Sequence, residues 1–269
     1  MTPHILPVGD GFRFCIFHEA QRRPAKGAVL YVHPFAEEMN KSRRMAARQA
    51  RLLAEAGYCV LQMDLFGSGD SSGGFEEATW DIWLKDVAHA YHHLCALCRA
   101  PITFWGMRAG CLLAAQAAAE GVLPVNFIFW QPVLSGKLQW QQFLRLKLAG
   151  ELASGNSKGV TDEIRASLAA GKPVDIAGYL MAPALADGLE KAELLPPAET
   201  KPRVGWIEIP GRPDATLTPA AQKKIRDWEA AGCDVRPMVV HGPAFWQTTE
   251  IEDAPELLKV TLDILEAQA

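Results

Sequence analysis

A five-residue stretch at 106–110 carries the strongest chemical signal in the chain. Gly106-Met107-Arg108-Ala109-Gly110 has the frame of a Gly-x-Ser-x-Gly nucleophile elbow, with arginine at the position of the serine. An apolar run at 102–105 precedes it and a helix-forming run at 111–119 follows, which is the strand, turn and helix context that the motif requires. A guanidinium stays protonated near neutral pH and is no nucleophile, but it binds carboxylate or phosphate groups in a fork. The stretch therefore predicts an anion-binding corner, and the alternative is a buried ion pair at Arg108 that binds nothing.

A second group of polar side chains follows the apolar run at 28–33. It comprises Glu37, Glu38, Asn40, Lys41, Arg43 and Arg44. Its carboxylates can pair with Arg108, and Glu37 or Glu38 can serve as a general base toward water. A paired arginine lowers the pKa of a carboxylate and weakens it as a base. The alternative is an ordinary helix N-terminus, with acids in the first turn and bases further along.

Strand and helix patterns alternate along the chain, and they predict a mostly parallel sheet covered by helices on both faces. The predicted strands are 11–18, 28–33, 58–63, 102–105, 125–131, 204–209 and 235–241, and the predicted helices are 41–56, 79–97, 111–119, 219–231 and 255–267. The segment 136–200 breaks this alternation with helical pieces at 138–148 and 162–169. We interpret 1–269 as a single α/β domain with 136–200 as a helical cap inserted over a ligand crevice.

Composition excludes several classes of protein. Hydrophobic residues make up 49% of the 269 residues, charged residues 22%, and the net charge is -4, so no basic excess points to nucleic acid. The N-terminus lacks the pattern of a signal peptide, and no run approaches the roughly 18 apolar residues of a membrane helix. We expect a cytoplasmic protein whose six cysteines are reduced core thiols.

Three longer motifs carry a resemblance to known proteins. They are HPFAEEMNKSRR at 33–44, DLFGSGDSSG at 64–73 and WGMR at 105–108. With the order of elements, they resemble the α/β-hydrolase superfamily and, more narrowly, the exosortase A system-associated hydrolase 2 family. The resemblance implies an eight-stranded α/β-hydrolase fold without a cofactor, and a bacterial hydrolase of an ester or other acyl bond linked to exopolysaccharide and protein-sorting loci.

The resemblance also locates the positions of a catalytic triad. Asp214 matches the acid loop after the seventh strand, and the histidine expected after the eighth strand aligns with Phe245. His241 lies four positions earlier. A standard Ser-His-Asp triad is therefore not expected. One hypothesis is a hydrolase of esters or thioesters that uses Arg108 for anion stabilisation and Glu37, Glu38 or His241 as base. The other is an inactive module that binds an anionic or acyl ligand.

Further residues complete the predicted site. We expect the ligand to be a small molecule and its contacts to come from Phe35, Asn40, Arg43, Arg44, Met107 and Phe245. The weaker candidates for a nucleophile are Ser71, Ser72, Ser135 and Cys111. A single Cys95-x-x-Cys98 pair is weak evidence for zinc, so no metal is expected. A homodimer is an assembly that the sequence leaves open.

Overall fold

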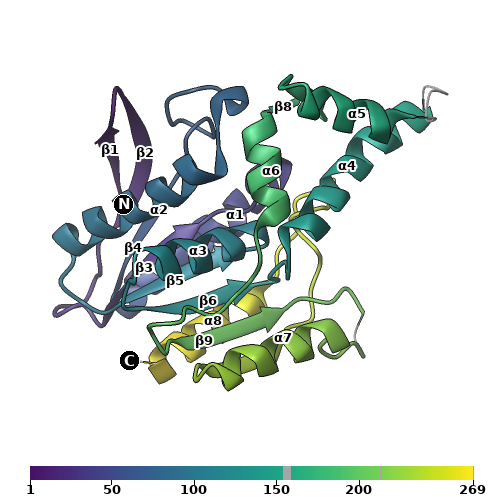
Figure 1. Ribbon diagram of the computed structural model, residues 1–269. Coiled ribbons are helices and arrows are strands. Elements are labelled where there is room, and N and C mark those ends of the chain that lie inside the picture. The colour runs from purple at the N-terminus through teal and green to yellow at the C-terminus, as the bar shows by residue number, and fades with distance from the viewer. Residues whose placement is uncertain (154–158, 213, 269) are drawn as a thin grey trace.

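An eight-stranded sheet forms the centre of the computed structural model, which describes residues 1–153, 159–212 and 214–268 (Figure 1). In spatial order its strands are β1 (Thr2–Val8), β2 (Gly11–His18), β4 (Tyr58–Met63), β3 (Gly27–Val32), β5 (Ile102–Met107), β6 (Val125–Trp130), β9 (Arg203–Glu208) and β10 (Asp234–Val239). Strand β2 pairs antiparallel with β1 and β4, and the strands from β4 to β10 are parallel. The predicted mostly parallel sheet is confirmed, while β1 was not anticipated.

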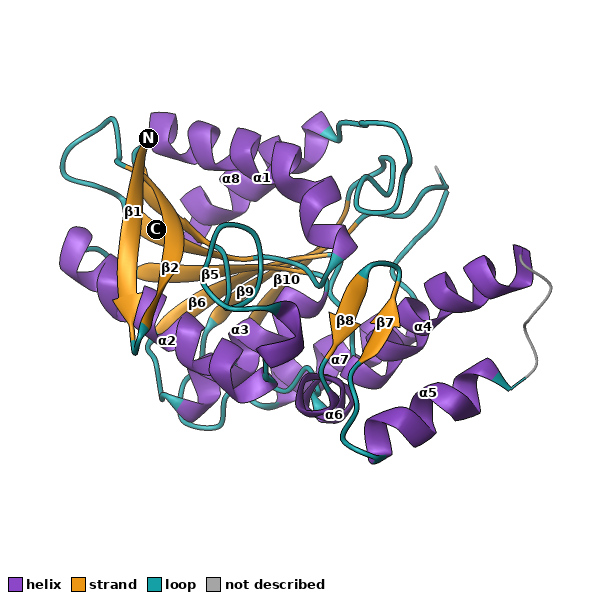
Figure 2. Cartoon of the chain, turned by 90° about the horizontal axis from the view of Figure 1, so that it is seen from above, coloured by secondary structure: helices purple, strands orange, loops and turns teal. Residues whose placement is uncertain are grey.

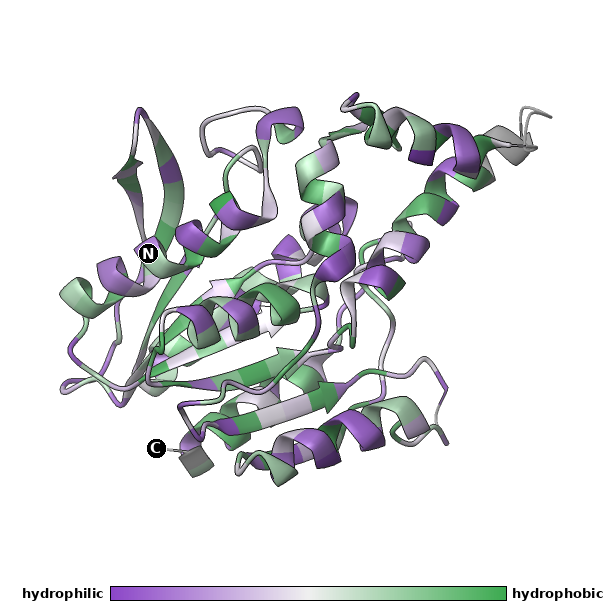
Figure 3. Ribbon diagram, viewed as in Figure 1, coloured by the Kyte–Doolittle hydropathy of each residue, from purple (hydrophilic) through white to green (hydrophobic). Residues whose placement is uncertain are grey.

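Helices cover both faces of this sheet, as the sequence predicted (Figure 2). On one face lie α1 (Glu37–Ala56) and α8 (Pro255–Gln268), and on the other lie α2 (Trp80–Leu97), α3 (Ala109–Glu120) and α7 (Pro219–Ala230). Every residue of β3 and β5 is buried, because both faces of these central strands are covered. Hydrophobic residues dominate the central strands, and the surrounding helices alternate between apolar and polar positions (Figure 3).

The segment between β6 and β9 departs from the strand and helix alternation. It contains α4 (Gly136–Ala153), α5 (Val160–Ala169), a hairpin of β7 (Val174–Ile176) and β8 (Tyr179–Met181), and α6 (Pro183–Lys191). The two expected helical pieces are present, whereas the hairpin and α6 were not predicted. Residues 154–158, between α4 and α5, lie outside the described residues. Helix α4 contacts α3, α5, α6 and β7, and α6 contacts α2.

Sharp turns join three adjacent strands to the segments that follow them. Ala36, Arg108 and Gln131 have φ of 50°, 55° and 44°, which is unusual for residues with a side chain. A Cβ on Gly110 would lie 2.3 Å from the carbonyl oxygen of Val32, and one on Gly106 would lie 2.8 Å from Cα of Cys111. Close packing therefore requires residues without a Cβ on both sides of residue 108.

Within the described part of the chain, no helix is both long and apolar enough to cross a membrane.

Candidate functional site

Arg108 lies at the N-terminus of α3, and its side chain is held by three partners. Its Nε donates to Glu38 Oε1 at 3.1 Å, and one terminal nitrogen donates to Gln142 Oε1 at 2.6 Å and Gln139 Oε1 at 3.4 Å. Gln139 Nε2 donates in turn to Glu38 Oε2 at 3.3 Å. The side chains of Arg108 and Glu38 are only 7% and 14% exposed. The guanidinium therefore binds an anion supplied by the chain itself, which is the ion-pair alternative for this residue.

Two aromatic residues from the loop after β10 border the pair. The guanidinium of Arg108 lies 5.6 Å from the ring centroid of Trp246, which is within range of a cation–π interaction. Phe245 is buried, and its ring packs edge-on against Trp246 and Trp130 at 5.3 Å and 6.4 Å between centroids. A phenyl ring in the position expected for histidine has no proton acceptor, so it contributes packing alone.

Burial changes the acid–base character of Glu38. Removal from water raises the pKa of its carboxyl group, and the charge and hydrogen bonds of Arg108 and Gln139 act in the opposite direction. The net shift is upward because desolvation is the largest contribution. Glu38 is consequently a stronger base than an exposed carboxylate, although its partner is a cation.

A cavity of about 440 Å³ lies over this pair and is called here the site cavity. Its walls come from the β3–α1 turn, from α1, from α4 and from the loop after β10; Phe35, Glu37, Glu38, Gln142, Phe143 and Trp246 are among its lining residues. Gln139 and Gln142 were missed by sequence analysis, although the spacing of 139, 142, 143 and 146 marks one face of a helix.

A second cavity, of about 430 Å³, lies beside the first. Asn40, Gly69, Phe75 and Tyr179 are among its lining residues. The Tyr179 hydroxyl accepts from Asn40 Nδ2 at 3.0 Å and donates to Glu37 Oε2 at 3.3 Å. Since Glu37 lines the site cavity and Asn40 the second one, Tyr179 stands in the wall between them.

The other predicted site residues lie in different surroundings. Arg43 pairs with Asp64 at 3.2 Å, and Arg44 forms two hydrogen bonds with Asp253, at 2.9 Å and 3.1 Å. Met107 is fully buried, so its side chain does not reach the cavity.

The candidate acid Asp214 and the candidate base His241 are both exposed. Neither makes a hydrogen bond or ion pair with any residue that the structure describes. The site therefore unites Arg108, Glu38 and Phe35, and it does not bring Asp214 or His241 to them by any contact.

Comparisons with known proteins address the architecture. No family model matches the sequence. The human protein ABHD12B is 30% identical over 105 residues, which is 39% of this chain and 28% of that protein. A carboxyl esterase from Bacillus coagulans superimposes with a TM-score of 0.69 at 14% identity, covering 99% of this chain and 98% of the esterase.

Two further solved structures agree. Mouse alpha/beta hydrolase domain-containing protein 10 gives a TM-score of 0.61 at 14% identity, with 100% of both chains covered. Monoglyceride lipase from Saccharomyces cerevisiae gives 0.64 at 16% identity, covering 98% of this chain and 93% of the lipase. This chain has the α/β-hydrolase fold. At these identities the likeness establishes the fold alone.

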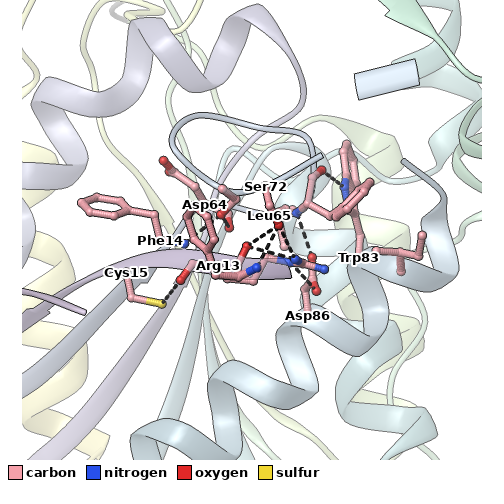
Figure 4. A network of polar contacts seen from close by, with 12 residues as sticks. Arg13, Phe14, Cys15, Asp64, Leu65, Ser72, Trp83 and Asp86 are labelled. Atoms are coloured by element: carbon pink, nitrogen blue, oxygen red, sulfur yellow. Dashed lines mark hydrogen bonds and ion pairs between the residues drawn. The ribbon is translucent and has the colours of Figure 1, made fainter. Parts of the chain in front are cut away.

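On this α/β-hydrolase fold, the serines after β4 have structural roles (Figure 4). Ser71 Oγ accepts from the backbone N–H of Phe14 at 2.9 Å, and Ser72 Oγ accepts from that of Phe12 at 2.9 Å. Both bonds fasten the loop 64–73 to β2. These hydroxyls are therefore engaged with the backbone of β2.

Two further candidates on this α/β-hydrolase scaffold concern cysteine. Cys111 is fully buried, and burial raises the pKa of its thiol well above the ordinary value, which disfavours the reactive thiolate. Within the ranges that the structure describes, no group of three or more His, Cys, Asp or Glu side chains is placed to hold a metal ion.

Proposed function

We propose that this protein binds a small acyl-bearing or anionic molecule in the site cavity without forming an acyl-enzyme. The observation that carries the proposal is the position of Arg108: it occupies the elbow beneath the cavity, and its guanidinium is engaged by Glu38, Gln139 and Gln142. Covalent acyl transfer requires a nucleophile beside a base, and the elbow presents an arginine where the nucleophile would stand.

The form of the site cavity supports ligand binding. Its volume of about 440 Å³ lies within the range of about 300–1,000 Å³ that is typical of small-molecule sites. Its lining combines aromatic rings, such as Phe35 and Phe143, with the polar groups of Gln142 and Glu37. Such a mixture suits a molecule with an apolar body and a polar end.

A second candidate function is hydrolysis by direct attack of water on an ester or thioester. It is favoured by Glu38, which lines the site cavity. Burial raises the pKa of this carboxyl group, so that it can accept a proton from water. Glu38 would take a proton from water, the water oxygen would attack the acyl carbon, and the alcohol or thiol would leave with a proton. Arg108 would position Glu38 in this scheme, and the exposed Asp214 and His241 have no part in it.

We also propose that the protein serves bacterial exopolysaccharide or protein-sorting systems in the cytoplasm, on the motif resemblance alone. The first motif supplies Glu38 and the third supplies Arg108, so two of the three motifs meet at one ion pair. Deletion of the gene should lower the yield of exopolysaccharide in its host. An unchanged yield would count against this association.

Obstruction of the cavity tests the binding proposal. Leu146 lines the site cavity and is 47% exposed, so Leu146→Trp should fill the cavity without disturbing the core. We expect octanoate or octanol to raise the melting temperature of the native protein and to lose that effect in Leu146→Trp. Leu138→Trp is the matched control, because Leu138 is also 47% exposed on α4 and does not line the cavity.

Assays of 4-nitrophenyl butyrate and butyryl thioesters separate the two candidates. Turnover that is abolished in Glu38→Gln and retained in Asp187→Asn, a control at an exposed carboxylate of α6 that does not line the cavity, would establish hydrolysis by water. A covalent butyryl adduct seen by mass spectrometry would overturn both candidates. If neither octanoate nor octanol shifts the melting temperature of the native protein, the binding proposal fails.

A further inference from the structure

We infer that the ligand of the site cavity is an amphipathic anion, whose carboxylate or phosphate group lies at Lys41 and Arg145 and whose apolar part packs on Phe143, Leu146 and Trp246. The inference rests on the proposed binding function and names the chemical class of the ligand. It also assigns anion binding to the mouth of the cavity, whereas the sequence predicted anion binding at Arg108.

The balance of charge around the cavity is positive. Two acids, Glu37 and Glu38, and two cations, Lys41 and Arg145, line it, and Arg108 lies against Glu38. Because Arg108 neutralises Glu38, one acid remains against two cations. That acid, Glu37, already accepts a hydrogen bond from the Tyr179 hydroxyl.

The two cations have donors to spare. Lys41 Nζ makes one long hydrogen bond of 3.4 Å to the backbone carbonyl of Gln247. The side chain of Arg145 is exposed and forms no hydrogen bond or ion pair with the part of the chain that the structure describes. An ammonium has three donor hydrogens and a guanidinium has five, so both can bind the oxygens of an incoming anion.

The residues of α4 that line the site cavity lie at different depths in it. Gln139 and Phe143 are buried at 3% and 4% exposure, whereas Leu146, one turn further along the same face, is 47% exposed. The amide of Gln139 is occupied by Arg108 and Glu38, so the floor holds few free polar groups. The apolar part of the ligand therefore packs on the wall of the cavity, and its charged group binds at the mouth beside Arg145.

Four probes with one chain length and different head groups test this inference: octanoate, octyl phosphate, octanol and octylammonium. We expect the native protein to bind the two anions at least about fourfold more tightly than octanol, because two cations at the mouth of the cavity each contribute about two- to fivefold. The preference should shrink as salt rises, since exposed charges are screened. Octylammonium should bind most weakly.

Alanine variants identify the cations. In the double variant Lys41→Ala/Arg145→Ala, the preference for octanoate and octyl phosphate over octanol should disappear while the affinity for octanol is retained. Both side chains lie at the surface of the cavity, so the fold should persist, and circular dichroism checks this. Lys137→Ala is the matched control, because Lys137 is an exposed cation of α4 that does not line the cavity.

The outcomes separate this inference from the proposed function. Equal affinity of the native protein for octanoate, octyl phosphate and octanol would overturn the anionic head group and leave the binding proposal standing. A preference that survives in the double variant would overturn the assignment to Lys41 and Arg145. Absence of binding by all four probes would refute the binding proposal itself.

Discussion

The exchange of serine for arginine at residue 108 changes the electrostatics of the site as well as its nucleophilicity. Arg108 and Glu38 are both largely buried, and removal of one member of such a pair typically costs about 3–5 kcal/mol because the other charge is left unpaired. The amides of Gln139 and Gln142 satisfy further donors and acceptors of the pair. A site of this kind is held rigid by its own charges before any ligand enters.

His33, at the end of β3, uses both ring nitrogens in a way that requires a neutral ring. Nδ1 donates to the carbonyl of Pro34 at 2.8 Å, and Nε2 accepts from the backbone N–H of Leu65 at 3.2 Å. Burial lowers the pKa of His33 below its ordinary value of 6.5. Protonation would place an N–H against the Leu65 N–H, so acid should break this connection between β3 and the loop 64–73.

The His33→Gln variant tests the resulting dependence on pH. A histidine whose folded pKa is lowered contributes stability above about pH 6.5, and this stability is lost as pH falls toward the folded pKa, because only the unfolded chain binds the proton. We expect the free energy of unfolding, measured in urea from pH 5 to 7.5, to fall less steeply in His33→Gln than in the native protein. The slopes of the two proteins should differ by an amount that approaches the uptake of one proton on unfolding, about 1.4 kcal/mol per pH unit.

The exposed His241 supplies the control for this experiment. His241→Gln is the matched control, because His241 is exposed and makes no hydrogen bond or ion pair with the residues that the structure describes. Parallel slopes for the native protein and His33→Gln would contradict the assignment to His33.

At the scale of elements, the elbow depends on how closely α3 approaches the end of β3. The hypothetical Cβ of Gly110 lies 2.3 Å and 2.6 Å from the carbonyl oxygens of Val32 and His33, which are backbone atoms that cannot turn aside. Gly110→Ala should therefore lower the free energy of unfolding by about 1–3 kcal/mol, the usual cost of overpacking. Urea unfolding measures the effect.

Gly211 is the matched control for the elbow. A Cβ there meets no heavy atom within 4 Å, so Gly211→Ala should leave stability within about 0.5 kcal/mol of the native protein. An equal effect of the two alanine substitutions would show that close approach is not what requires glycine at 110.

Much of this architecture could be predicted from the sequence, since it depends on local pattern. The alternation of apolar runs and helical spacing identified the parallel strands, and the glycine frame identified the elbow. The pairing of Arg108 with Glu38 was one of two open alternatives, because the residues lie 70 positions apart. The partners Gln139 and Gln142 depend on where α4 crosses the sheet edge, and the hairpin has strands of only three residues, too short for a period to register.

At the scale of the whole molecule, one buried ion pair joins three parts of the chain. Arg13 Nε on β2 contacts Asp86 Oδ1 on α2 at 2.7 Å, and Asp86 Oδ2 accepts from the backbone N–H of Phe66 at 2.8 Å (Figure 4). The two side chains are 4% and 1% exposed. Burial raises the pKa of Asp86 overall, although Arg13 and Phe66 favour its charged form. The pair therefore fixes the loop 64–73 between the antiparallel edge and a covering helix.

Arg13→Leu should loosen this connection far from the substitution. We expect faster hydrogen exchange at the amides of Phe66 and Ser72, and a loss of about 3–5 kcal/mol of stability, because Asp86 remains buried without its cation. Arg23→Leu, which removes an exposed pair with Glu19, should change neither quantity measurably. Unchanged exchange at Phe66 in Arg13→Leu would show that the loop holds its place without the pair.

Backbone turns of one kind recur at Ala36 and Arg108, with φ and ψ of 50° and −126° at the first and 55° and −123° at the second. At Arg108 the close packing of Gly106 and Gly110 stabilises this backbone conformation, and the conformation does not depend on the type of side chain at 108. The backbone of such a turn fixes the position and direction of the side chain at its centre, whichever residue stands there. The backbone of the elbow can therefore be retained while the residue at its centre is exchanged, and the chemistry of the site changes with that residue alone.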